Sequence, residues 1–156
     1  MTLPRIDIDD PEFDVNEGEV VFYRGERFTG EVVEYQKGAL VSLVTYKDGI
    51  EDGPSKEWYM EGTPRSDGVL RGGFPVGESK DWHPDGRLAA RVLMSENGLR
   101  QLEITEWDDK GNLTREWRAE RGWRGAGRAD HRFLPGTPVD AHLRHGPTVH
   151  PLVHAM

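Results

Sequence analysis

The most constraining feature of this chain is a glycine-and-aromatic pattern that recurs about every 24 residues in four consecutive units, 25–48, 49–72, 73–97 and 98–121. A fixed period of this length is typical of repeat proteins, in which each unit packs mainly on its neighbours and the array presents a binding surface. The columns that keep the period are Gly25, Gly49, Gly73 and Gly98; Gly38, Gly62, Gly86 and Gly111; and Trp58, Trp82 and Trp107.

Turn residues divide each unit into two strands. Asp48-Gly49, Asp85-Gly86 and Asn97-Gly98 are strong hairpin signals, because glycine accepts positive φ at low cost. In the second unit we expect strands over 55–59 and 64–70 around a turn at 60–62, and residues 19–23 predict a first strand before the repeats. The sequence therefore predicts an all-β fold, an antiparallel meander of roughly 8 to 10 strands built from four hairpin repeats.

Composition divides the chain into three parts. Residues 1–19 form an acidic leader, which is expected to be a short strand or a loop covering one end of the array. Residues 20–122 form the repeat domain. Residues 123–156 form an irregular tail rich in histidine and proline, in which helix is not expected.

Strand periodicity assigns the repeat columns to two faces, because alternate side chains point to opposite sides of a sheet. The tryptophan and leucine columns are expected to form the packed face. They contain Glu34, Trp58, Trp82 and Trp107, and Leu40, Pro64, Leu88 and Leu113. The flanking columns are expected on a more polar opposite face. They contain Val33, Glu57, Asp81 and Glu106, and Tyr35, Tyr59, His83 and Asp108.

Charge and composition exclude several functional classes. The formal net charge is −8, so we expect no nucleic-acid partner, because phosphates require a basic surface. The chain has no cysteine, which excludes disulfides, zinc–thiolate sites and thiol nucleophiles. No secretory signal and no apolar run of the roughly 18 residues that a membrane helix needs is visible. We therefore expect a cytoplasmic protein that does not bind membranes.

The flanking columns are the candidate site. Glu57, Asp81 and Glu106 would lie roughly 10 Å apart on alternate strands, as an acidic ladder suited to a basic partner. The alternative is a solvated face neutralised by nearby lysines and arginines. The tryptophans are either interface anchors or core. The candidate partner-binding residues are Glu57, Tyr59, Asp81, His83, Glu106 and Asp108.

Other groupings give weaker signals. Five histidines lie in the tail: His131, His142, His145, His150 and His154. The pair His142 and His145 has a spacing found in some metal sites, but no carboxylate or cysteine cluster completes a ligand set. Glycines among Arg121, Arg124 and Arg128 would suit an anion, yet no phosphate-loop lysine follows. We predict no catalytic residues, no cofactor and no metal.

Several stretches resemble a known repeat family. They are Tyr23 to Gly30, Trp58 to Gly62, Trp82 to Leu88 and Trp107 to Leu113, and the similarity extends over about residues 20–118. Together they resemble the MORN-repeat variant of the YwqK family of bacterial proteins. Pro64 and Leu102 depart from the family pattern, as does Glu34 at the first tryptophan position. The resemblance implies a hairpin-repeat fold and, because the family is commonly described as antitoxin components, a protein-binding role.

The resemblance and the acidic balance together predict an antitoxin or immunity-type protein. Such a protein would bind a basic bacterial toxin and block its active site without chemistry of its own. Two alternatives stay open. One is a non-catalytic interaction scaffold, and the other is a metal-binding protein or enzyme that uses the tail histidines.

Overall fold

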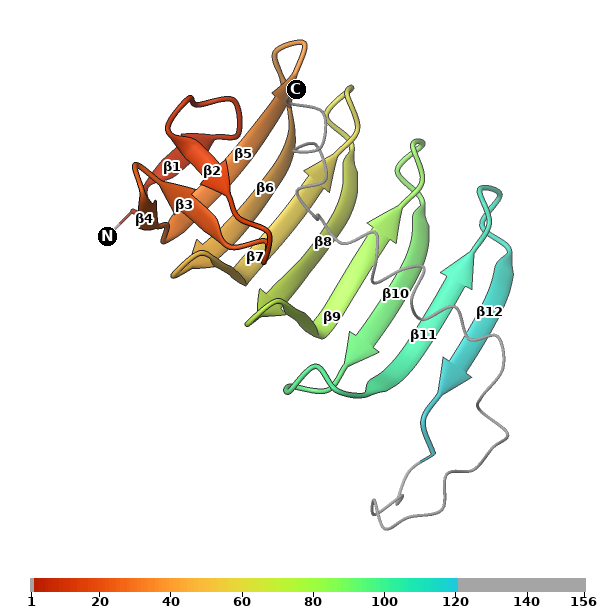
Figure 1. The fold of residues 1–156 in the computed structure, drawn as a ribbon. Coiled ribbons are helices and arrows are strands. Elements are labelled where there is room, and N and C mark those ends of the chain that lie inside the picture. Colours follow the sequence, from red (N-terminus) through yellow and green to blue (C-terminus); the bar gives the residue numbers. More distant parts are fainter. Residues whose placement is uncertain (1, 121–156) are drawn as a thin grey trace.

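The computed structural model describes residues 2–120, which form twelve strands and no helix (Figure 1). The strands are β1 (Arg5–Asp7), β2 (Phe13–Val15), β3 (Val21–Tyr23), β4 (Glu26–Arg27), β5 (Gly30–Gln36), β6 (Ala39–Lys47), β7 (Ile50–Trp58), β8 (Pro64–Arg71), β9 (Phe74–Trp82), β10 (Leu88–Met94), β11 (Gln101–Trp107) and β12 (Leu113–Arg118). None of the described residues forms a helix that could cross a membrane.

Nine strands make one large sheet in the order β1-β5-β6-β7-β8-β9-β10-β11-β12. Strands β5 to β12 follow chain order as an antiparallel meander, and β1 pairs in parallel with β5. The all-β meander predicted from the repeats is therefore confirmed. The strand predicted over 19–23 is found as β3, but it joins a separate three-stranded sheet, β2-β3-β4, because its hydrogen-bond partners lie in the leader and in β4.

Left-handed backbone at the hairpin tips explains the regular folding of the array. Lys37 and Gly38 have φ values of 49° and 82°, and Asp48 and Gly49 have 49° and 80°. Two consecutive positive φ values define the turn whose twist matches paired antiparallel strands. The hairpins that join β5 to β6 and β6 to β7 therefore close at the glycines that carry the repeat.

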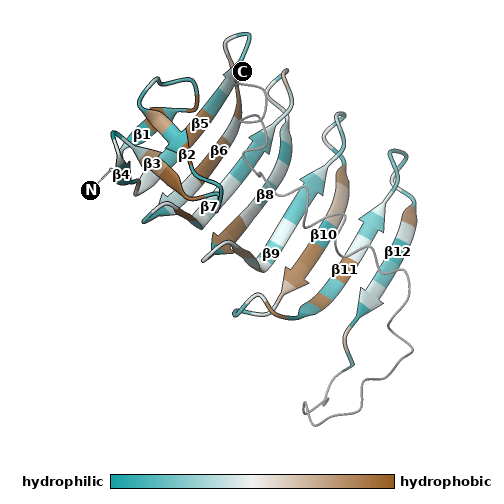
Figure 2. Ribbon diagram, in the orientation of Figure 1, coloured by the Kyte–Doolittle hydropathy of each residue, from teal (hydrophilic) through white to brown (hydrophobic). Residues whose placement is uncertain are grey.

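Most buried residues lie on one side of the large sheet, called the core face below. Val32, Val44 and Ser55 are cross-strand neighbours on this face, and Val92 and Ile104 continue it at 4% and 0% exposure. The small sheet β2–β4 packs on the core face at the N-terminal end, where Val21 and Phe28 join the core (Figure 1). Hydrophobic residues are concentrated in β3, β6 and β10, whereas the turns are mainly hydrophilic (Figure 2).

The face assignment expected for the tryptophan column is wrong. Trp58, Trp82 and Trp107 are only partly buried and none belongs to the buried core, while Leu113 is 54% exposed. Each tryptophan follows a residue that points to the core face, so alternation directs its side chain to the opposite face, called the tryptophan face below. The small sheet covers the other side, which is why the tryptophans remain outside the core.

The register also corrects the first unit. Tyr35 pairs with Leu40 just as Trp58 pairs with Pro64, so Tyr35 and not Glu34 takes the tryptophan position. The reason is that the Lys37-Gly38 hairpin is one residue shorter than the later ones. Glu34 lies four residues before Gly38, as Trp58 lies four residues before Gly62, but the shorter hairpin places Tyr35 at the equivalent position in the sheet.

The β6–β7 hairpin fastens the small sheet to the large one. The Val21 amide donates to the Gly49 carbonyl at 2.9 Å, and the Gly49 amide donates to the Phe28 carbonyl at 2.8 Å. A Cβ added at Gly49 would lie 2.5 Å from Val20 Cγ1 and 2.7 Å from the Val21 carbonyl oxygen. Only glycine fits at this junction, because it must combine positive φ with a close backbone approach.

Glu51 places a partly buried carboxyl near this junction. It pairs with the buried Tyr46 across β6 and β7. Burial, and to a smaller extent the negative charge of Glu19, raise the pKa of the Glu51 carboxyl to about 7. Burial and the same two carboxylates also raise the pKa of the Tyr46 hydroxyl. No sequence pattern singles out Glu51, because its burial arises only when the chain folds.

We predict that Gly49→Ala destabilises the protein far more than Gly25→Ala. Both glycines have φ of 80°, so both substitutions impose a similar backbone strain, but a Cβ at Gly25 meets nothing within 4 Å. The additional clash at Gly49 should cost about 2–4 kcal/mol in the free energy of unfolding. Urea denaturation of both variants measures the difference, and equal losses would contradict the proposed junction.

We also predict a pH-dependent stability that Glu51→Gln removes. The folded-state pKa of about 7 lies above the ordinary value of 4.5, so protonated Glu51 is favoured by folding. The stabilisation that this proton contributes to the free energy of unfolding is fully present below the ordinary pKa of 4.5. It falls by about 2–3 kcal/mol as pH rises to about 7. Denaturation midpoints between pH 4 and pH 8 should fall less for Glu51→Gln. The exposed Glu116→Gln serves as control and should keep the parent profile.

Candidate functional site

Four carboxylates occupy one cross-strand row on the core face, called the acidic row below. Successive register pairs connect Glu34 to Ser42, Ser42 to Glu57, Glu57 to Ser66 and Ser66 to Asp81, and the row continues through Ala90 to Glu106 and Arg115. The acidic row is therefore Glu34, Glu57, Asp81 and Glu106, on β5, β7, β9 and β11. Small side chains on the strands between them leave the carboxylates roughly 10 Å apart.

The middle of the acidic row is electrostatically unfavourable. Burial raises the pKa of the Glu57 carboxyl, and the like charges of Asp81 and Glu34 act in the same direction. Arg65 and the Ser66 hydroxyl oppose this shift, with Arg65 Nε at 3.9 Å and Ser66 Oγ at 3.4 Å from Glu57 Oε2. Arg65 is more than half exposed and its ion pair is long, so it screens Glu57 weakly. An additional cation near the row would relieve the remaining repulsion.

Arg115 ends the acidic row at the last strand. Its NH1 atom lies 3.7 Å from Glu106 Oε1, and both side chains are about one-fifth exposed, at 20% and 19%. Arg115 therefore offsets part of the negative charge at the β11–β12 end of the row. The predicted ladder thus has an additional member at its N-terminal end, Glu34, in place of the expected Val33.

Tyr59 and His83 connect successive repeats. The Tyr59 hydroxyl donates to the Trp82 carbonyl at 2.7 Å, and Nε2 of His83 donates to the Trp107 carbonyl at 2.9 Å. These bonds span 23 and 24 residues, one repeat each. The two residues expected as contact residues therefore have a structural role, because each aligns its own hairpin turn on the next one.

Asp108 shapes the last turn. Its carboxylate accepts bonds from the amides of Lys110 and Asn112, both at 2.9 Å. The hydrogen bonds from Asn112, the backbone amide foremost, lower the pKa of the Asp108 carboxyl. Of the six expected contact residues, Glu57, Asp81 and Glu106 thus share the acidic row, while Tyr59, His83 and Asp108 lie at the adjoining turn edge.

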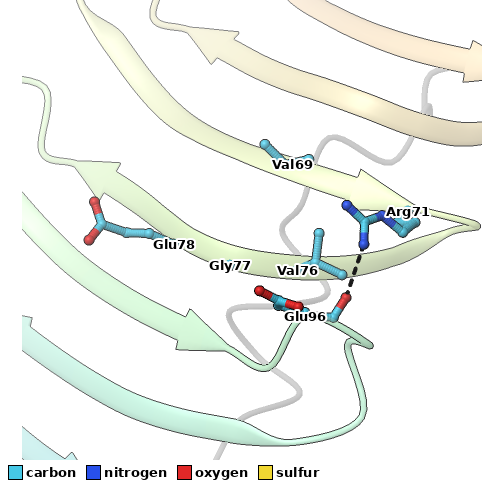
Figure 3. A pocket seen from close by; sticks show the side chains of 6 residues that line it. All are labelled: Val69, Arg71, Val76, Gly77, Glu78 and Glu96. Carbon is cyan, nitrogen blue, oxygen red and sulfur yellow. Dashed lines mark hydrogen bonds between the residues drawn. The ribbon is translucent and has the colours of Figure 1, made fainter.

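A shallow pocket of about 360 Å³ lies at the other end of the strands. Its walls are Val69 and Val76 from the adjacent strands β8 and β9, and the Arg71 guanidinium reaches the Glu96 carbonyl at 3.5 Å beside them (Figure 3). Val69 and Arg71 alternate with Gly68 and Leu70 of the core face, so the pocket opens on the tryptophan face. No sequence pattern predicts this pocket, since β8 and β9 form it jointly.

The remaining candidates give no site in the described part. Within residues 2–120, no group of three histidine, aspartate or glutamate side chains is arranged to hold a metal ion. The tail histidines His131, His142, His145, His150 and His154 and the arginines Arg121, Arg124 and Arg128 lie outside the described residues. The metal and anion hypotheses that rest on them therefore stay as predictions.

Comparisons with known proteins give no relative from which a function could be transferred. No protein-family model matches the chain, and no curated protein or solved structure is significantly similar to it. The resemblance to the MORN-repeat variant therefore remains a prediction from the residues.

We predict that Tyr59→Phe lowers the free energy of unfolding by about 1 kcal/mol, because the Trp82 carbonyl loses its donor. Tyr35→Phe is the control, since Tyr35 is 43% exposed and makes no side-chain hydrogen bond within the described residues. Chemical denaturation compares the two. A Tyr59→Phe variant as stable as the parent would argue that the inter-repeat bond contributes nothing.

Proposed function

We propose that this protein is a non-catalytic binding protein of the antitoxin or immunity type, which neutralises a basic bacterial toxin. The observation that supports it best is the acidic row, in which four repeat-related carboxylates share one register. Aligned charges of one sign on a half-buried surface attract a cationic protein and accelerate its association. The toxin assignment itself rests on the family resemblance.

Inhibition in this proposal is occlusion. A catalytic cleft that binds a polyanionic substrate is lined with lysine and arginine, and those side chains would lie against Glu34, Glu57 and Asp81. Binding would compensate the like-charge repulsion that raises the pKa of the Glu57 carboxyl. Part of the binding free energy would therefore come from relief of the like-charge repulsion that is already present in the free protein. The remainder would come from the contacts around the acidic row.

We predict that the double variant Glu57→Lys/Asp81→Lys weakens toxin capture by at least about tenfold and reduces its dependence on salt, because steering and direct ion pairs are both lost. The partner is first identified by co-purification from the native host with the tagged full chain. Affinity is then measured by titration calorimetry at low and at physiological ionic strength.

The matched control is Glu12→Lys/Glu26→Lys, which changes the net charge equally at exposed positions outside the acidic row. This variant should keep most of the affinity. Equal weakening in both double variants would mean that only net charge matters. Unchanged affinity in Glu57→Lys/Asp81→Lys would exclude the acidic row as the contact surface.

The scaffold alternative makes a different prediction for the same experiment. A general interaction scaffold should co-purify with several proteins at substoichiometric levels. An immunity protein should co-purify with one basic partner at equal amounts. The ratio of partner to bait therefore separates the two functions before any variant is made.

A further inference from the structure

The tryptophan face is a large sheet surface on which no strand of the small sheet lies, although Val33 and Leu43 at its N-terminal end are already buried. Among residues 2–120 the small sheet β2–β4 lies on the core face, and no described strand crosses the opposite side (Figure 1). This surface carries Tyr35, Trp58, Trp82 and Trp107 on alternate strands, all of them partly exposed. Large aromatic side chains that are partly exposed to solvent are typical of protein–protein interfaces.

The charges on this face are balanced, although the whole chain is strongly acidic. Arg91 Nε lies 2.7 Å from Glu78 Oε2, Lys80 Nζ lies 3.2 Å from Glu78 Oε1, and Arg118 Nε lies 3.1 Å from Glu103 Oε1. These pairs alternate with the hydrophobic side chains. A net charge of −8 repels a second copy in general, but this surface presents both signs and can meet an identical surface without a charge penalty.

The extent of the face suits a stable dimer. Strands β5 to β11 contain seven to nine residues each. Seven strands at about 4.8 Å spacing, with about 3.3 Å per residue, cover roughly 900 Å². A standard specific interface buries about 800 Å² on each partner.

The pocket supplies a partner for one of the tryptophans. Val69, 42% exposed, and Val76 form apolar walls, and the Arg71 guanidinium adjoins them. An indole ring would bury its apolar surface on the valines and offer its face to the guanidinium. Trp82 lies on β9 six residues beyond Val76, at the opposite end of the same strand.

We propose that the protein forms a two-fold symmetric dimer through its tryptophan faces, with Trp82 of each copy seated in the Val69–Val76 pocket of the other. A two-fold axis that lies parallel to the sheet and crosses β9 at Ser79 brings Trp82 over the partner's Val76, because the two positions are equally far from Ser79, and the reciprocal contact follows by symmetry. The same operation brings Lys80 of one copy toward Glu78 of the other. Both acidic rows then face outward, so the dimer has two equivalent surfaces for a basic partner.

Engineered cysteines test this geometry without dependence on the unknown partner. The parent chain has no cysteine. The double variant Val69→Cys/Trp82→Cys should be cross-linked between copies by a thiol-specific bismaleimide that spans about 10 Å, which matches the spacing of two stacked sheets, and the product should run as a dimer on a denaturing gel. An intramolecular cross-link is excluded, because the two positions are about 20 Å apart along the strands, beyond the span of this reagent.

The single variants Val69→Cys and Trp82→Cys are the controls and should cross-link much less. Equal cross-linking in a single variant would overturn the pocket assignment, because it would place two identical positions together. Absence of cross-linking in the double variant, at a protein concentration at which Trp82→Ala still sediments as a dimer and with sheet content retained in its circular dichroism spectrum, would also overturn the proposal.

Sedimentation of the full chain gives a second readout. The parent should sediment as a dimer, and Trp82→Ala should weaken dimerisation by at least about tenfold, as expected of an interface anchor. The neighbouring Asp81→Ala, on the core face, should leave the dimer intact. A parent that stays monomeric at its highest soluble concentration contradicts the dimer. Because no partner takes part, this result is independent of whether toxin binding fails.

Discussion

The structure depends on the register of one hydrogen-bonded meander. Because β5 to β12 pair in chain order, residues one repeat apart fall on alternate strands of the same row. This register turns a 24-residue period into two lines of side chains, carboxylates on the core face and aromatic residues on the tryptophan face. Tyr59 and His83 reinforce it, because each bonds to the carbonyl of the next repeat. Any change that shifts a hairpin by one residue would exchange the two faces.

A single sheet must cover at least one face, and here the small sheet β2–β4 supplies the cover. It closes over Val32, Val44 and Tyr46, and Gly49 makes the junction close enough for backbone hydrogen bonds. The same packing partly buries Glu51 and raises its pKa to about 7. The stability of the N-terminal end and its response to pH therefore have one origin, which is the contact of the segment from Val20 to Phe28 with the β6–β7 hairpin.

The two faces suit different kinds of contact. The acidic row combines partial burial with like charges, which favours a cationic partner. The opposite face combines aromatic side chains with internally paired charges, which favours an identical surface. If both proposals hold, dimerisation and partner binding use opposite sides of one layer and do not compete. Because the large sheet of each copy is a single layer, a dimer formed through the tryptophan faces exposes both acidic rows.

The sequence by itself determined the all-β meander, the hairpin positions and the acidic ladder of Glu57, Asp81 and Glu106. Glycine columns and strand alternation are local properties, and a sheet in chain order preserves them. Only the tertiary structure decided which face is buried, because burial depends on where the small sheet β2–β4 packs and not on the repeat. It also placed Glu34 in the row, since the short Lys37-Gly38 turn shifts the first unit by one residue. The Glu51 carboxyl and the Val69–Val76 pocket likewise arise only when separate strands come together.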